Sequence, residues 1–276
     1  MAVFMKPPFQ KSAPRFNRKY DKPPPPKPGP ANDAERKLVF NPENDLIYGA
    51  HSVAAALVNP KRKCVKLWTT ENGAARLREE IGELPIEPEL VHPRLLDHML
   101  KSQDAVHQGI ILEAKPLRQP RLDQLPHEGL VLVLDQVTDP HNVGAIMRSC
   151  AAFNVTAVVT TTRNAAETNG VFMKAASGAY EHVPYVTVTN LARALQELRT
   201  NGFKLVGLDS EAETIMDDLA PSRPLALVLG AEGKGMRQLT RDTCDVIARI
   251  EMPGKIKSLN VSIAAALSLY ALSRTT

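Results

Sequence analysis

From residue 130 onward, short uninterrupted apolar runs alternate with longer stretches of helical periodicity. The apolar runs are LVLVLD (130–135), TAVVTT (156–161), KLVGLD (204–209) and LALVLG (225–230), and the helical stretches lie near 143–153, 191–201 and 235–244. Strands without polar alternation, separated by helices, indicate a parallel sheet that is covered on both faces. The sequence therefore predicts an α/β domain with a parallel sheet over residues 130–276.

The stretch before this domain is shorter and less regular. Apolar segments at 46–49, 65–70 and 109–112 indicate strands, and the segments 51–57, 74–81 and 93–101 indicate helices. These six elements predict a small α/β domain over residues 45–115. Residues 116–129 hold three prolines and no sustained apolar pattern, so we expect them to form the linker between the two domains.

Residues 1–44 fit neither pattern. The first 30 residues hold seven Lys or Arg and one acid, Asp21, a net charge of +6 in a chain whose total is +4. They also hold nine prolines, which interrupt helices and sheet ladders. We expect a disordered basic arm, which either attracts RNA phosphates or serves only as a solubilising tail.

The bulk composition excludes several classes of protein. A chain of 276 residues that is 43% hydrophobic can bury one large core or two smaller ones. No apolar run approaches the ~20 residues that cross a bilayer, and no signal-peptide core is present, so we expect a soluble cytoplasmic protein that does not contact membranes. The three cysteines, Cys64, Cys150 and Cys244, are far apart and odd in number, which argues against a disulfide framework or a metal site.

Polar side chains follow the predicted strand at 130–135, within the sequence DPHNVGAIMR (139–148). Asn142 is placed to cap a helix, and Gly144 lets another segment approach closely. Arg148 lies in the second helical turn, beside apolar neighbours. A guanidinium near the carboxyl end of a strand is well placed for a phosphate or a developing oxyanion, although a solvent-exposed arginine would give the same sequence.

A glycine-rich turn, GAEGKG (230–235), follows the predicted strand at 225–230. Its spacing is neither GxGxxG nor GxxxxGK[ST], so a dinucleotide or nucleoside triphosphate site is not supported. A flexible loop would explain the glycines but not Glu232, which could accept a hydrogen bond from a hydroxyl group.

A third polar turn, KIKSLNVS (255–262), follows a predicted strand at 246–252 and opens an alanine-rich helix at 263–272. Its polar residues either cap that helix or form part of a binding site with the free backbone N–H groups. Ligands of parallel sheets bind beyond the carboxyl ends of the strands, so we expect the polar residues of the three turns to converge. These residues are Asn142, Arg148, Glu232, Ser258 and Asn260.

The segments DPHNVGAIMR, LVLGAEGKGM and IEMPGKIKSLNVSIAAAL resemble the three motifs of the SpoU group of RNA ribose 2′-O-methyltransferases. Within that group, the chain is most similar to the bacterial enzymes that methylate a guanosine in the peptidyl-transferase region of large-subunit ribosomal RNA. The segments LIYGAHSVAAAL and VHQGIILEA also resemble the family's N-terminal substrate-binding domain, which is similar to a ribosomal protein. The resemblance covers about residues 46–273.

The resemblance implies a homodimer that binds S-adenosylmethionine in a deep trefoil knot and acts on ribosomal RNA without a metal ion. By motif match, Gly230, Ile250 and Leu259 would line the cofactor pocket, and the five polar residues of the three turns would surround the ribose and the reacting methyl group. Because a guanidinium stays protonated, we expect Arg148 to stabilise the alkoxide and Glu232 to take the proton, directly or through water.

Two alternatives stay open. A transfer-RNA ribose methyltransferase is less favoured because of the predicted docking domain, and a non-catalytic RNA-binding or ribosome-assembly protein of the same fold is less favoured because the polar set is intact. In the docking domain, Lys61, Arg62 and Lys63 form a candidate phosphate-contact cluster, although a solvated loop would have the same composition.

Overall fold

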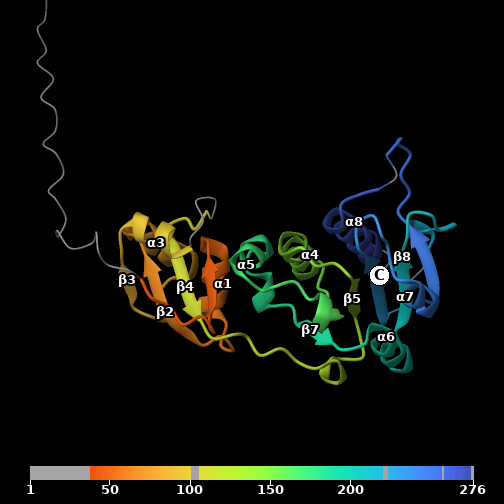
Figure 1. Cartoon of the computed structure of the whole chain (residues 1–276), viewed down its shortest axis with the longest axis horizontal. Helices are drawn as coiled ribbons and strands as arrows, with labels where there is room; N and C mark the ends of the chain where they lie inside the picture. Colours follow the sequence, from red (N-terminus) through yellow and green to blue (C-terminus); the bar gives the residue numbers. More distant parts are fainter. Residues whose placement is uncertain (1–37, 101–105, 220–222, 257, 275–276) are drawn as a thin grey trace, which may run out of the picture. The chain divides into compact units, whose positions relative to one another are not determined.

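The computed structural model describes residues 38–100, 106–219, 223–256 and 258–274 (Figure 1). The chain divides into two units, residues 1–36 and 37–276, and the second unit holds all the described helices and strands. Of the predicted disordered arm, residues 1–44, residues 1–37 lie outside the described residues, so their disorder stays a prediction. For residues 38–44 the prediction is wrong, because Asn41 and Asn44 donate hydrogen bonds to the carboxylate of Glu113 in β4 (Ile110–Ala114).

The first sheet is a mixed sheet of four strands in the order β1-β4-β2-β3. Strand β4 pairs antiparallel with β1 and β2, whereas β3 pairs parallel with β2. The elements of this part are β1 (Asp45–Tyr48), α1 (Ala50–Val58), β2 (Cys64–Thr69), α2 (Glu71–Ile81), β3 (Pro88–Leu90), α3 (Pro93–Leu100) and β4 (Ile110–Ala114). The six predicted elements are all present. Strand β3 was not predicted because it has three residues and begins with a proline, which only an edge strand tolerates.

The second sheet has seven strands in the order β7-β6-β5-β10-β8-β11-β9, and all its pairings are parallel. The predicted parallel α/β fold is therefore confirmed. The strands are β5 (Leu130–Asp135), β6 (Ala157–Thr161), β7 (Tyr185–Val188), β8 (Lys204–Leu208), β9 (Thr214–Ile215), β10 (Leu225–Gly230) and β11 (Val246–Arg249). The helices are α4 (Pro140–Ala152), α5 (Gly170–Ala176), α6 (Leu191–Thr200), α7 (Gln238–Thr243) and α8 (Val261–Arg274), with short 3-10 turns η1 (Leu122–Gln124), η2 (Thr162–Asn164), η3 (Ala179–Glu181) and η4 (Met216–Asp218).

The two faces of this sheet are buried against different helices. Along β5, Leu130, Leu132 and Leu134 point into a core shared with α4 and α8, whereas Val131 and Val133 point into a core shared with α6. Successive residues of a strand point to opposite faces, so an uninterrupted apolar run is what burial on both faces requires. Helix α4 packs between α5 and α8, and a side chain at Gly144 would meet the backbone of α5 at 2.6 Å, so this glycine allows the close helix contact (Figure 1).

The larger of these two cores continues into the first sheet. It includes Ile47 of β1, Val53 of α1 and Leu112 of β4 together with Phe172 of α5. The Ser52 hydroxyl donates a hydrogen bond of 2.8 Å to the backbone carbonyl of Met173 in α5. The small sheet and the parallel sheet therefore bury apolar surface against each other through α1 and α5.

Arg62 reinforces this junction, and its position corrects one expectation from the sequence. Its side chain is fully buried, and its guanidinium pairs with Glu181 of η3 at 2.5 Å and with Asp45 at 2.7 Å. It cannot contact RNA phosphates, so the proposed cluster reduces to the exposed Lys61 and Lys63. The sequence could not show this role because Glu181 lies 119 residues away from Arg62.

Candidate functional site

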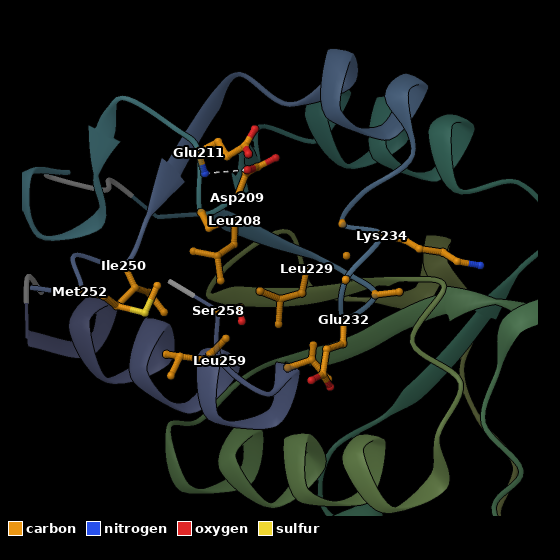
Figure 2. A pocket seen from close by; sticks show the side chains of 17 residues that line it. Leu208, Asp209, Glu211, Leu229, Glu232, Lys234, Ile250, Met252, Ser258 and Leu259 are labelled. Carbon is orange, nitrogen blue, oxygen red and sulfur yellow. Dashed lines mark hydrogen bonds between the residues drawn. The ribbon is translucent and has the colours of Figure 1, made fainter. Parts of the chain in front are cut away.

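The carboxyl ends of β8, β10 and β11 and the start of α8 enclose a cavity of about 400 Å³ (Figure 2). The cavity is lined by residues 208–211, residues 229–235, Ile250, Met252, Ser258, Leu259, Val261 and Ala264. Strand β8 lies between β10 and β11, so the three strand ends are neighbours at one edge of the sheet. Ligand cavities of parallel sheets are expected at this edge.

Five of the eight residues singled out from the sequence line this cavity: Gly230, Glu232, Ile250, Ser258 and Leu259. The end of β8 also contributes to the wall, with Leu208, Asp209 and Glu211, and these residues were missed. The signal was present, since Asp209 ends an apolar run in the same way as Asp135. The Asp209 carboxylate accepts a hydrogen bond of 2.9 Å from the backbone N–H of Glu211 (Figure 2). It also pairs with Arg241.

The loop after β10 is closed on itself at its base. Ala231 and Gly235 exchange two backbone hydrogen bonds of 3.1 and 2.8 Å. A side chain at Gly230 would meet the backbone carbon of Gly235 at 2.1 Å, so only glycine fits. Gly233 and Gly235 have positive φ angles of 76° and 65°, which glycine adopts without strain. The glycines thus serve a tight turn that presents backbone groups to the cavity.

A buried carboxylate fixes the far end of this loop. Asp135, at the end of β5, is fully buried and accepts hydrogen bonds from the backbone N–H and the Nε of Arg237 at 2.9 and 2.8 Å. Strand β5 pairs with β10, so the glycine loop is held at both of its ends by the same pair of strands. Glu232 is exposed within the loop, and Figure 2 shows the Lys234 side chain directed away from the cavity.

The side chains of Asn260 and Asn142 connect the N-terminus of α8 to α4. The side-chain oxygen of Asn260 accepts hydrogen bonds from the backbone N–H of Ser262 at 2.9 Å and from its hydroxyl at 2.6 Å, which is the N-cap arrangement of α8. Its side-chain nitrogen donates to the side-chain oxygen of Asn142 at 3.0 Å. Asn142 itself does not cap α4 as predicted, because Asp139 takes that position and accepts from the N–H of His141.

Arg148 does not reach the cavity within one chain. It lies six positions after Asn142, which on a helix corresponds to a rise of about 9 Å and a rotation of about 240°. Its exposed side chain lines two other hollows, one beside α1 and α2 and one beside α5. The predicted polar set is therefore divided: Glu232 and Ser258 line the cavity, Asn142 and Asn260 lie at its edge, and Arg148 points elsewhere.

The cavity suits an uncharged flat ring and a polar chain better than a phosphate or a metal ion. Its walls combine backbone groups with the apolar Leu229, Ile250 and Leu259, and its acidic side chains would repel anions. Within the described ranges, no three His, Cys, Asp or Glu side chains gather to hold a metal ion. Burial raises the pKa of Cys150, and that of Cys244 to about 12, so neither thiol ionises at neutral pH.

Two family models match the chain. The SpoU rRNA Methylase family matches residues 129–270, and RNA 2′-O ribose methyltransferase substrate binding matches residues 46–120. The 23S rRNA (guanosine-2′-O-)-methyltransferase RlmB of Escherichia coli (strain K12) is 38% identical over 242 residues, which cover 82% of this chain and 97% of that protein. RlmB of Pseudomonas aeruginosa is 37% identical over 238 residues, 83% of this chain and 96% of the relative.

Solved structures share the fold at lower identity. A crystal structure of an RNA 2′-O ribose methyltransferase has a TM-score of 0.73 and 23% identity, and covers 84% of this chain and 89% of the other. The SpoU methyltransferase AviRb from Streptomyces viridochromogenes, solved in complex with AdoMet, has a TM-score of 0.71 and 23% identity, with coverage of 84% and 90%. In the described part of the present chain, no helix is long and apolar enough to span a bilayer.

Proposed function

Because the chain belongs to the SpoU rRNA methylase family and is thereby an RNA ribose 2′-O-methyltransferase, we propose that it methylates a guanosine ribose of 23S ribosomal RNA. The observation that carries the proposal is the cavity at the ends of β8, β10 and β11, because three sequence segments far apart meet there around one ligand-sized space. The proposal of a guanosine in 23S ribosomal RNA as the substrate rests on the RlmB relatives, which are 37 to 38% identical to this chain.

S-adenosylmethionine, when bound, supplies an electrophilic methyl group on a sulfonium centre. The cavity has the size and lining for it: about 400 Å³, with apolar side chains for the adenine and backbone groups of the glycine loop for the polar chain. Gly230, Ile250 and Leu259 would hold it. The carboxylates of Glu211 and Glu232 suit a cationic ligand better than an anionic one, whereas Asp209 is paired with Arg241.

We assign Glu232, an acidic residue of the cavity wall, as the group that accepts the proton of the ribose 2′-hydroxyl. It is exposed on the glycine loop, so a ribose could approach it from solvent. A positioned base of this kind typically contributes about 10²- to 10⁴-fold to a proton-transfer step. Asn142, Ser258 and Asn260 would orient the ribose, since their amide and hydroxyl groups lie at the mouth of α8.

Arg148 would enter the site from a second copy of the chain, as a clamp for phosphate and alkoxide. Two observations support this. Arg148 points away from its own cavity, and Ile263, Leu267 and Tyr270 form an apolar stripe on α8 with exposures of 51, 43 and 51%. A symmetric dimer would bury such a stripe twice. The trefoil knot implied by the family motifs stays a prediction.

Mapping of 2′-O-methylation on ribosomal RNA from cells with and without the protein tests the function. We expect one guanosine of the large-subunit RNA to lose its methyl group in the deletion strain and to regain it with the intact gene. An unchanged methylation map, together with methylation of transfer RNA in a purified assay, would contradict the proposal.

A further inference from the structure

A second hollow, of about 490 Å³, lies beside α4 on the side away from the cofactor cavity. Tyr48 and Val106 contribute to it from the first sheet's part of the chain, His141 and Arg148 from α4, and Val171 and Lys174 from α5. We call it the α4–α5 groove. The function proposed above assigns it no task beyond the presence of Arg148.

One wall of the groove is apolar and open to solvent. Val106 and Val171 are exposed by 57% and 48%, although both are large hydrophobic residues. The ring of Tyr48 lies flush against Gly170, where a Cβ atom would come within 2.0 Å of a ring carbon. This contact holds the ring at the junction of β1 and α5, where Tyr48 is only 6% exposed. The surface open to a ligand is therefore that of the two valines.

The other wall is cationic. Arg148 and Lys174 line the groove, and within the described ranges neither side chain has a carboxylate or hydrogen-bond partner. His141 adds a third basic side chain when protonated. Among the described residues, no carboxylate lines the groove. The hollow on the other side of Arg148 differs in this respect, because Glu80 lines it and pairs with His51 at 2.9 Å. An anion would therefore prefer the α4–α5 groove.

We propose that the α4–α5 groove binds a single-stranded nucleotide of the RNA substrate, its base on Val106 and Val171 and its phosphate on Lys174. Exposed apolar surface next to basic side chains suits the base and the phosphate of an unpaired nucleotide. The inference rests on the proposed function and extends it. Arg148 is shared between the groove and the site that it would complete in a second copy, so the bound nucleotide would be a neighbour of the methylated one.

Two substitutions test the groove without touching the cofactor cavity. Lys174→Ala removes the phosphate contact, and Val171→Glu places a carboxylate on the apolar wall. Lys204→Ala is the matched control, because Lys204 is equally half-buried but lies at the amino end of β8, at the opposite edge of the sheet. Binding of unmodified large-subunit ribosomal RNA is measured at several salt concentrations, together with the KM for RNA, the KM for S-adenosylmethionine and the Tm.

We expect Lys174→Ala to weaken RNA binding about tenfold and to lower the slope of log affinity against log salt by about 1. Val171→Glu should raise the KM for RNA at least as much. Both variants should keep the KM for S-adenosylmethionine and the Tm, and Lys174→Arg should restore binding. Lys204→Ala should behave as the unchanged protein.

If both groove variants keep the RNA affinity and the salt slope of the unchanged protein, the groove does not bind RNA. Equal losses in Lys204→Ala would also overturn the proposal, because they would show a general effect of charge. Failure of the proposed function is a separate result. In that case the unchanged protein transfers no methyl group, while the binding measurements still decide whether the groove holds RNA.

Discussion

Among the glycines that line the cavity at the ends of β8, β10 and β11, Gly230 has the least free space. A methyl group there would lie 2.1 Å from the carbonyl carbon of Gly235 and 2.2 Å from the nitrogen of Met236. We expect Gly230→Ala to force the glycine loop open and to weaken S-adenosylmethionine binding by more than about tenfold, as calorimetric titration would show. Gly254→Ala is the control, because a Cβ at Gly254 meets nothing within 4 Å. Equal affinity in the two variants would contradict the tight-turn role of Gly230.

Glu232 is the residue on which the proposed proton transfer depends. The substitution Glu232→Gln keeps the size of the side chain but removes its ability to take a proton, so we expect kcat to fall about 100-fold or more with little change in cofactor affinity. Lys234→Ala, two residues along the same loop, should have a small effect because Lys234 points away from the cavity. Near-normal single-turnover rates for Glu232→Gln would show that another group accepts the proton.

At the level of single residues, the sequence indicated the chemistry of the site better than its geometry. Glycines and an acid after an apolar run, as in 230–235, placed Gly230 and Glu232 near a ligand, and both line the cavity. Arg148 was expected beside them, but helical rotation turns it away, and periodicity alone does not show which face of a helix meets a ligand. Arg62 looked like a surface cation because its buried partners come from distant parts of the chain.

At the level of elements, strands with an uninterrupted apolar sequence were predicted best. Strands β5 and β10 were predicted at their observed bounds, since each is buried on both faces and uninterrupted in sequence. Helix α5 and strand β7 were missed, because they span only seven and four residues. Strand β9 has two residues and is defined only by its pairing with β11. Tertiary contacts, rather than local pattern, specify such short elements.

Arg62 lies in the loop between α1 and β2, and its buried ion pairs join β1 to η3, so their removal should be costly. Arg62→Met would leave the carboxylates of Glu181 and Asp45 without their shared cation, so we expect the free energy of unfolding to fall by about 3–5 kcal/mol in urea denaturation. Lys63→Met, one residue away on the exposed surface, should change it by less than about 0.5 kcal/mol. Similar losses in both variants would mean that the pairs do not stabilise the junction.

On the scale of the whole molecule, each site of the proposed dimer would combine Glu232 of one chain with Arg148 of the other, which can be tested by mixing variants. Arg148→Ala and Glu232→Gln should each be inactive, yet a mixture that exchanges subunits should recover about a quarter of the unchanged activity. Half of the dimers would then be mixed, and each would hold one intact site. Native mass spectrometry verifies that mixed dimers form. Mixed dimers without any activity would place Arg148 and Glu232 in the same chain's site, or outside catalysis.

The basic arm is the other feature of the whole chain. Deletion of residues 1–40 removes the segment that carries the excess positive charge, so we expect weaker RNA binding and a smaller dependence of affinity on salt. Affinity for S-adenosylmethionine should stay the same, because the cavity is built from residues 208–264. An unchanged salt slope would show that the arm does not contact RNA.

The hydrogen bond between Asn142 and Asn260 has a consequence for how acid and alkali act on the protein. Carboxamides carry no titratable proton in the pH range in which carboxylates and imidazoles ionise, so the contact between α4 and the start of α8 keeps the same strength across that range. The part of the cavity edge that this contact holds then keeps its shape while carboxylates elsewhere in the wall change their protonation. A change of rate with pH would therefore not come from the loss of this contact.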